Sequence, residues 1–325
     1  MIATLEIFTT LGSRLATLST TPEGEAIIAK AIADNPWFTR DDILHAVEAI
    51  RHDMLSRESL SRWLDSYTPV DSPQDVALIM AGNIPLVGFN DLLCVIASGH
   101  RCHLKPSSKD SVLMRYIVGL LRDIEPSVPI YDYSPERHYD IAIATGGEDA
   151  NRYFREHFAN TRTLLRGSRH SLAVLDGRES SEELEALSSD VSRYSGLGCR
   201  SVSMIMLPRG CDIELPKSEC VNPKLGGNIR TMRALMTMQG KSFRECGAYL
   251  VVESREFPKS LATVSLCYYD DWSSVKGWIE EHREEIQCIV SRTDIEGSVP
   301  FGCAQRPTLW DYADGVDTMK FLSDI

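Results

Sequence analysis

The sequence predicts an α/β protein in which two α/β domains follow an N-terminal helical layer. Residues 1–68 carry apolar side chains spaced three and four apart, the periodicity of amphipathic helices. From residue 76 onward, short apolar runs bounded by glycine and proline alternate with helical stretches, which is typical of a parallel sheet with covering helices. At 325 residues, with 43% hydrophobic and 25% charged residues, the chain is long enough for two cores.

Residues 1–68 form the predicted helical layer, to which we assign packing rather than chemistry. Helical spacing of apolar residues runs through residues 25–34, 41–50 and 55–67. Pro36 and Thr39 separate the first two of these segments as a stop signal and an N-cap.

Residues 69–166 are expected to form the first α/β domain. Strands are predicted at residues 76–81, 130–133 and 139–144 and just before Lys105, and helices at 112–124 and 148–158. Asn83 follows the first strand in the turn Gly82-Asn83-Ile84-Pro85. Because ligands bind at the carboxyl ends of strands in open α/β sheets, Asn83 is a candidate site residue. The alternative is a turn asparagine that bonds its own backbone.

Two further turns of this domain join a predicted strand to a predicted helix. They are Lys105-Pro106-Ser107-Ser108 and Thr145-Gly146-Gly147. A helix N-terminus with hydroxyl and ammonium groups suits phosphates or ribose hydroxyls, and glycines permit close approach of a ligand to the backbone. The alternative for the serines is a helix-capping role. The G-x-G-x-x-G dinucleotide fingerprint is absent.

Residues 167–298 are expected to form the second α/β domain, with the boundary close to Gly167. Strands are predicted at residues 171–175, 204–207, 248–252, 262–268 and 287–290, and helices at 182–191, 229–239 and 273–283. Cys199 follows Gly196 and Gly198 between a helix and a strand. A thiol on an accessible turn, with backbone N–H groups facing the substrate, can attack acyl groups and stabilise the oxyanion. The alternative for Cys199 is a small buried hydrophobe.

Composition restricts the function classes. A net charge of −12 and a pI near 5.2 argue against nucleic-acid binding. The N-terminus shows no signal-peptide pattern and no run approaches a membrane span, so we expect a cytoplasmic protein. The nine cysteines are scattered without metal-ligand spacing, which favours reduced thiols and no metal site.

Five motifs occur in an order that resembles the aldehyde dehydrogenase superfamily. They are Gly82-Asn83-Ile84-Pro85, Lys105-Pro106-Ser107-Ser108, Thr145-Gly146-Gly147, Gly196-Leu197-Gly198-Cys199 and Pro300-Phe301-Gly302. The continuation Leu86-Val87-Gly88-Phe89, the run Ser98-Gly99-His100 and the arginine after Cys199 are more similar to the acyl-CoA reductase branch, known from bacterial luminescence. The resemblance covers most of the chain from about residue 76.

The resemblance implies an aldehyde dehydrogenase-like fold. Residues 69–166 would be a Rossmann-like NAD(P)-binding domain, 167–298 the catalytic domain, and 299–325 a C-terminal segment that returns towards the active-site cleft. It also implies that Cys199 is the nucleophile and Asn83 an oxyanion donor. The implied cofactor contacts are Lys105, Pro106, Ser107, Ser108, Thr145, Gly146 and Gly147.

Two departures from the superfamily pattern bear on the reaction. The glutamate that activates water in ordinary members is replaced by Leu165, so transfer to or from a thiol is favoured over hydrolysis. The glutamate that holds the nicotinamide ribose has no clear counterpart, and Glu253 and Glu256 are weak candidates. The chain is also short for the superfamily, so an oligomerisation arm is in doubt and a homodimer is left open.

The resemblance therefore implies reduction of an acyl thioester to an aldehyde. Cys199 would attack the thioester of an acyl-CoA or an acyl carrier protein, with coenzyme A as the leaving group in the first case. Arg193 and Arg200 would favour the thiolate. Ser108 stands where a glutamate would repel a 2′-phosphate, and Lys105 and Lys109 flank it, so we expect NADPH.

Three other functions stay open on the sequence. An aldehyde dehydrogenase would oxidise an aldehyde with NAD(P)+, although Leu165 speaks against it. A catalytically silent protein of this fold would bind a nucleotide or a partner. A cysteine hydrolase would need a histidine base, and none of His100, His103, His138 and His170 stands in a recognisable partner motif.

Overall fold

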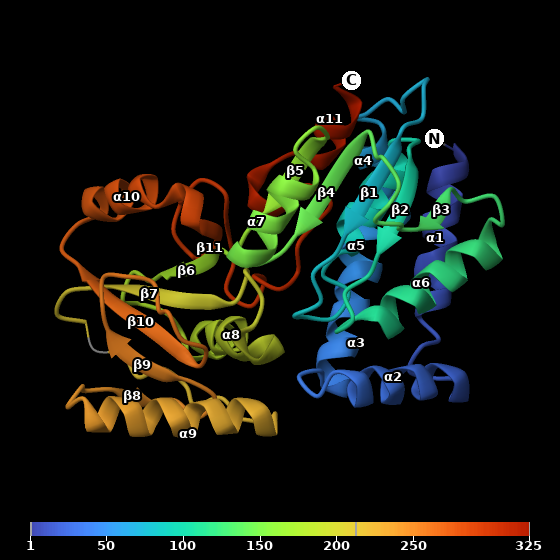
Figure 1. The fold of residues 1–325 in the computed structure, drawn as a ribbon. Helices are drawn as coiled ribbons and strands as arrows, with labels where there is room; N and C mark the ends of the chain where they lie inside the picture. The colour runs from blue at the N-terminus through green and yellow to red at the C-terminus, as the bar shows by residue number, and fades with distance from the viewer. Residues whose placement is uncertain (1, 212, 325) are drawn as a thin grey trace. The chain divides into compact units, whose positions relative to one another are not determined.

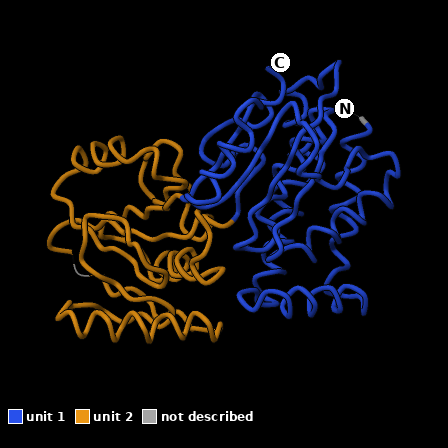
Figure 2. Tube along the Cα trace, viewed as in Figure 1, with its two compact units in different colours: residues 1–168, 306–325 blue, residues 169–305 orange. Residues whose placement is uncertain are grey.

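The computed structural model describes residues 2–211 and 213–324 (Figure 1). The chain divides into two compact units, Met1–Ser168 with Arg306–Ile325 and Arg169–Gln305 (Figure 2). Each unit is built on a β-sheet. The four-part division proposed from the sequence assigns roles as well as boundaries, and it stays a prediction.

The first unit contains a five-stranded sheet with the strand order β3-β2-β1-β4-β5. Its strands are β1 Asp75–Ile79, β2 Arg101–Lys105, β3 Ile130–Asp132, β4 Ile141–Thr145 and β5 Arg162–Arg166. All neighbouring pairs are parallel. The predicted strands are confirmed because their apolar runs are buried, as parallel strands require. Strand β5 was not predicted, since only its two leucines mark it as apolar.

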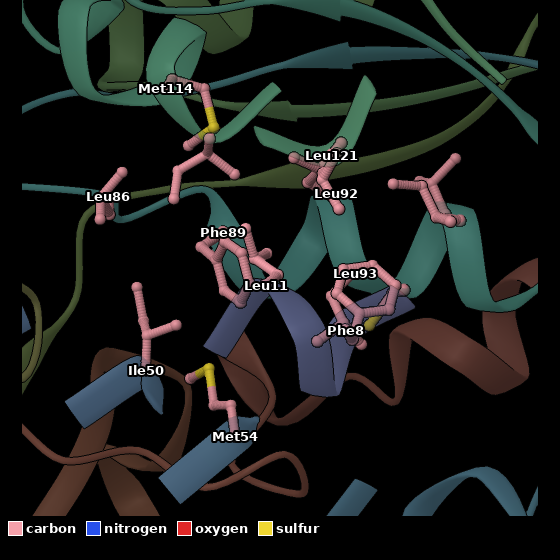
Figure 3. Close-up of a cluster of buried hydrophobic side chains, with 14 of the residues drawn as sticks. Phe8, Leu11, Ile50, Met54, Leu86, Phe89, Leu92, Leu93, Met114 and Leu121 are labelled. Carbon is pink, nitrogen blue, oxygen red and sulfur yellow. The ribbon is translucent and has the colours of Figure 1, made fainter. Parts of the chain in front are cut away.

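The helices of the first unit include the N-terminal layer that the sequence predicted. They are α1 Ile2–Leu15, α2 Pro22–Asp34, α3 Arg40–Ala49, the π-helix η1 Ile50–Met54, α4 Arg57–Leu64, α5 Phe89–Ala97, α6 Ser111–Ile124, α7 Glu148–His157, the 3-10 turn η4 Ala313–Gly315 and α11 Thr318–Ser323. Thr39 caps α3, as predicted, by accepting a hydrogen bond from the Asp42 N–H. Buried Phe8, Leu11, Ile50 and Leu93 pack α1, η1 and α5 together (Figure 3).

The second unit contains a seven-stranded sheet with the order β12-β11-β6-β7-β10-β9-β8. Its strands are β6 His170–Val174, β7 Val202–Pro208, β8 Arg244–Glu245, β9 Leu250–Glu253, β10 Thr263–Tyr269, β11 Ile286–Ser291 and β12 Ser298–Val299. Only β8 and β9 pair antiparallel among the strand pairs described. The helices are α8 Ser181–Ser192, the 3-10 turn η2 Arg193–Gly196, α9 Pro223–Met238, α10 Trp272–Glu281 and the 3-10 turn η3 Arg283–Glu285.

Candidate functional site

Three of the predicted site segments lie at one edge of the first sheet. Asn83 follows β1, Lys105 ends β2 and Thr145 ends β4. Because β1 lies between β2 and β4 and all three run parallel, their carboxyl ends are adjacent (Figure 1). The strand order reverses between β1 and β4, and ligands of open α/β sheets bind at such a switch point.

The segment after β2 packs against the turn that carries Asn83 and fixes its conformation through Ser107 and Asp110. A Cβ atom placed on Gly82 would lie 2.6 Å from both Cβ and Oγ of Ser107, so only glycine permits this approach. The Leu86 N–H, on a residue with a φ of 56°, donates to Oδ2 of Asp110 at 2.8 Å. Asp110 is buried, and burial raises its pKa to about 8 although the Leu86 N–H opposes the shift. Asn83 itself is half-buried.

The segment from Lys105 to Asp110 presents polar groups to solvent beside that turn. The side chains of Lys105, Ser108 and Lys109 are exposed. The Lys105 carbonyl accepts a hydrogen bond from the Met80 N–H at 3.1 Å, which fixes the end of β2 against the end of β1. Ammonium and hydroxyl groups held at this position are donors for anionic oxygens.

The Thr145-Gly146-Gly147 turn joins β4 to α7. A Cβ on Gly146 would lie 2.7 Å from that of Ala150, whereas a Cβ on Gly147 would meet nothing within 4 Å. Gly147 is the N-cap of α7, so its open surroundings leave the N-terminal turn of that helix accessible. Buried Asn151, which sequence reasoning missed, donates to the carbonyls of Gly146 at 3.1 Å and Arg166 at 2.9 Å.

Cys199 of the second unit lies on a turn with unusual backbone geometry. Tyr194, Ser195 and Gly196 have φ values of 54°, 57° and 72°, so three successive residues are left-handed. The Leu197 N–H donates to the Tyr194 carbonyl at 3.1 Å and closes this turn. A left-handed conformation costs about 1–2 kcal/mol for a residue other than glycine, and such strain gathers at functional sites. Cys199 is half-buried.

Polar contacts hold the Cys199 turn against the sheet and against Ala304 and Gln305. The Ser171 hydroxyl on β6 donates to the Cys199 carbonyl at 2.8 Å. The Arg200 guanidinium contacts the Ala304 carbonyl and lies 3.4 Å from Sγ of Cys288. The Gln305 amide donates to the Ser201 hydroxyl at 2.9 Å. The expected thiolate-stabilising role of Arg200 therefore competes with a structural one.

Asp190 of α8 is a buried carboxyl group that sequence reasoning missed. Its Oδ2 accepts the Gly302 N–H at 2.6 Å and its Oδ1 accepts the Ala304 N–H at 3.0 Å. Burial raises the pKa of Asp190 to about 6, against the lowering effect of these hydrogen bonds and of Arg200. No sequence signal marks this residue, because its partners lie more than a hundred positions away.

Three of the four candidate histidines, His100, His103 and His170, have structural partners. His100 contacts the Gln74 N–H and the Leu322 carbonyl, and His103 contacts the Asp75 carboxylate at 2.9 Å. His170 stacks on Phe257 with ring centres 4.4 Å apart, and burial lowers its pKa. His138 is exposed.

The remaining candidates are placed as follows. Leu165 is half-buried in β5, and Glu253 and Glu256 are exposed. The nine cysteines, all within the described residues, are thiols rather than disulfides. Within residues 2–211 and 213–324, no three His, Cys, Asp or Glu side chains are grouped so that they could hold a metal ion. None of the helices in those ranges is long and apolar enough to cross a membrane.

Comparison with known families matches this chain to one of them. The sequence model described as "Acyl-CoA reductase (LuxC)" matches residues 17–257, about three quarters of the chain. The chain belongs to this acyl-CoA reductase family. The resemblance to the acyl-CoA reductase branch predicted from the motifs is confirmed.

Two curated thioester reductases are similar to this chain over part of their length. The "Long-chain acyl-protein thioester reductase" of Photorhabdus laumondii is 25% identical over 179 residues, 49% of this chain and 37% of that protein. The protein of the same name from Aliivibrio fischeri is 26% identical over 179 residues, 47% of this chain and 36% of that protein. The chain thus matches about a third of the length of these curated relatives.

Solved structures establish the fold of this family member. Aldehyde dehydrogenase 21 of Physcomitrella patens superposes with a TM-score of 0.61 at 13% identity, over 90% of this chain and 73% of that one. The NAD+ complex of a Bacillus cereus aldehyde dehydrogenase gives a TM-score of 0.60 at 15% identity, over 91% and 72%. The predicted aldehyde dehydrogenase-like α/β fold is confirmed.

Proposed function

We propose that this chain reduces an acyl thioester to an aldehyde with NADPH, through a covalent thioester on Cys199. The observation that carries the proposal is the turn before Cys199, in which three successive left-handed residues present a half-buried thiol in a member of the acyl-CoA reductase family. The printed names of the curated relatives, which are thioester reductases, support the same reaction class.

In the first half of the reaction, the Cys199 thiolate attacks the carbonyl carbon of the substrate thioester. The bond from that carbon to the donor sulfur then breaks, and the donor leaves as a thiol after taking up a proton. The oxyanion formed on the way is stabilised by the Cys199 N–H and by the Asn83 amide, the donor that the family resemblance assigns.

In the second half, a bound nicotinamide cofactor would supply the hydride that reduces the acyl carbon. The bond between that carbon and Sγ of Cys199 breaks, Cys199 returns to the thiolate, and the aldehyde is released. The leucine at position 165 gives the acyl-enzyme no carboxylate to activate water. This favours reduction or return to a thiol over hydrolysis.

The cofactor is assigned to the carboxyl edge of the first sheet. Two observations fit a nucleotide there: open space at Gly147 before α7, and exposed donors on Lys105, Ser108 and Lys109. Pro106, Ser107, Thr145 and Gly146 complete the proposed contact set. Because no carboxylate stands at Ser108, the two lysines can neutralise a 2′-phosphate, which favours NADPH over NADH.

The test replaces the nucleophile and measures NADPH oxidation with a long-chain acyl-CoA and with the same acyl group on a carrier protein. Cys199→Ala should abolish turnover with both donors, whereas Cys211→Ala, another half-buried thiol of the same unit, should leave it within about twofold. Full turnover by Cys199→Ala contradicts the proposed chemistry. Aldehyde oxidation by the parent without a thiol acceptor would favour the dehydrogenase reaction instead.

A separate variant tests the preference for NADPH over NADH. Ser108→Glu should move the preference from NADPH towards NADH, because the new carboxylate repels the 2′-phosphate and accepts a hydrogen bond from a ribose hydroxyl. The ratio of kcat/KM for the two cofactors measures it. An unchanged ratio contradicts the assignment of Lys105–Ser108 to the ribose.

A further inference from the structure

The surface around α9 differs in charge from the rest of the chain. The whole chain has 34 Lys and Arg against 46 Asp and Glu, but residues 217–244 contain six basic residues and one acidic residue. All six basic side chains are exposed: Lys217, Lys224, Arg230, Arg233, Lys241 and Arg244. Arg233 pairs with Glu245 at 3.5 Å. We call residues 217–244 the α9 surface.

The α9 surface also exposes large apolar side chains. Val221, Leu235 and Met238 are 68%, 43% and 85% exposed, and they are three of the nine large hydrophobic residues exposed in the described parts of the chain. The inner face of α9 buries Leu225, Ile229 and Met236 against its own unit. Exposed apolar groups among charges are typical of protein contact surfaces.

The α9 surface and Cys199 belong to the same unit and are linked through α8. Ser188 of α8 donates to the Pro216 carbonyl at 3.4 Å and contacts the Ser218 hydroxyl, just before α9 begins. The chain that leaves α8 forms the left-handed turn before Cys199. At its other end α9 lies beside β8, where Arg233 pairs with Glu245 (Figure 1).

We propose that an acidic protein carrying the acyl group docks on the α9 surface of this chain. The proposal rests on the proposed function and adds the surface on which a protein donor would bind. Six exposed cations complement an acidic partner and speed the encounter, and the apolar side chains supply the area that is buried on docking.

Helix length and charge favour a separate acidic protein over a second copy of this chain as the partner of the α9 surface. Sixteen residues of helix extend for about 24 Å, a length that suits contact with a protein. Two copies of α9 facing each other would bring like charges together, since the helix carries arginine and lysine but no Asp or Glu. A separate acidic protein would bring opposite charges together on this surface instead.

The experiment compares one long-chain acyl group on two donors, an acidic acyl carrier protein and coenzyme A. The double variant Arg230→Glu/Lys241→Glu should lower kcat/KM for the carrier-bound group by roughly tenfold and reduce its salt dependence, while acyl-CoA changes by less than about twofold. Lys276→Glu, an exposed lysine on α10, makes the same kind of charge change away from the α9 surface and should leave both values unchanged.

Direct binding of the carrier separates this proposal from the proposed function. Fluorescence anisotropy of labelled carrier protein should show binding to Cys199→Ala that the double reversal weakens about tenfold. If the parent reduces neither donor but binds the carrier in this way, the reductase function fails and the docking surface stands. Equal losses for both donors, or full activity of the double variant with the carrier, overturn the docking surface.

Two further outcomes would overturn the docking proposal and assign the α9 surface to another partner. A change in molar mass between the parent and the double variant, measured by sedimentation equilibrium, would assign the α9 surface to a second copy. Sedimentation of the parent with phosphatidylglycerol vesicles, lost in the double variant, would assign it to an anionic membrane.

Discussion

At the scale of single residues, the two buried carboxyl groups that contact the candidate segments are Asp110 and Asp190. Each accepts backbone N–H groups of a neighbouring loop, and burial raises the pKa of each. A carboxyl group in that state binds its proton more tightly in the folded protein than in the unfolded chain. Its contribution to stability is therefore largest at acid pH and is lost as pH rises through the folded pKa.

Asp110→Asn should change the pH dependence of stability. The folded pKa of Asp110 is raised from 3.8 to about 8, so the parent loses stability as pH rises through that window. The amide of the variant has no proton to lose and keeps an acceptor for the Leu86 N–H, so the fall between about pH 4 and pH 8 should flatten. Urea denaturation at several pH values measures it.

The control is Ser108→Ala, which changes an exposed side chain of the same unit without removing a titratable group. It should leave the slope of unfolding free energy against pH unchanged. A parent and an Asp110→Asn variant with the same slope would contradict the burial of a protonatable Asp110 beneath the Asn83 turn.

At the scale of elements, the backbone conformation of the turn between α8 and β7 decides where Cys199 lies. The structure puts two residues other than glycine in the left-handed region before Gly196. Packing must compensate for that strain, and Tyr194 and Ser195 are buried. The sequence predicted an accessible turn from Gly196 and Gly198 but gave no sign that the left-handed segment begins two residues earlier.

Replacing glycine by alanine should change the free energy of unfolding in opposite directions in this turn and in a helix. Gly196→Ala should lower the free energy of unfolding by about 1 kcal/mol, because alanine disfavours a positive φ. Gly277→Ala, inside α10 with nothing within 4 Å of the new Cβ, should raise it by up to about 1 kcal/mol. Thermal and urea unfolding compare the two, and an equal effect would exclude a left-handed Gly196.

At the scale of the whole molecule, residues 306–325 belong to the first unit, whereas residues 299–305 belong to the second. Tyr312 accepts the Trp63 indole N–H at 2.8 Å and shares a hydrogen bond with the Tyr67 hydroxyl at 2.8 Å. Buried Arg166 of β5 pairs with Asp91 of α5 at 2.9 Å and donates to the Thr318 hydroxyl of α11 at 2.6 Å. These contacts join segments at opposite ends of the chain within one unit.

Tyr312→Phe should therefore destabilise the first unit. Removing the hydroxyl leaves the buried Trp63 N–H without its acceptor, which costs about 1–3 kcal/mol. Tyr131→Phe, at an exposed tyrosine on β3, should change the free energy of unfolding by less than about 0.5 kcal/mol. Equal stability of the Tyr312→Phe variant and the parent, by urea unfolding, would contradict this hydrogen-bonded link.

The sequence by itself determined what local patterns encode. Buried parallel strands read as apolar runs, so β1, β4 and β7 could be predicted, and Thr39 could be predicted as a helix cap. The motif order identified the family and the fold, and it named Cys199 and Asn83, whose roles stay predictions.

Only the tertiary structure decided the rest, because the partners are distant in sequence. Strand β5 has too few apolar residues to be recognised locally, and it is defined by its pairing with β4. The contacts of Asp110 with the Asn83 turn and of Asp190 with Gly302 link positions that no local pattern connects. The left-handed run before Cys199 depends on packing that offsets its backbone strain, and single-residue preferences oppose it.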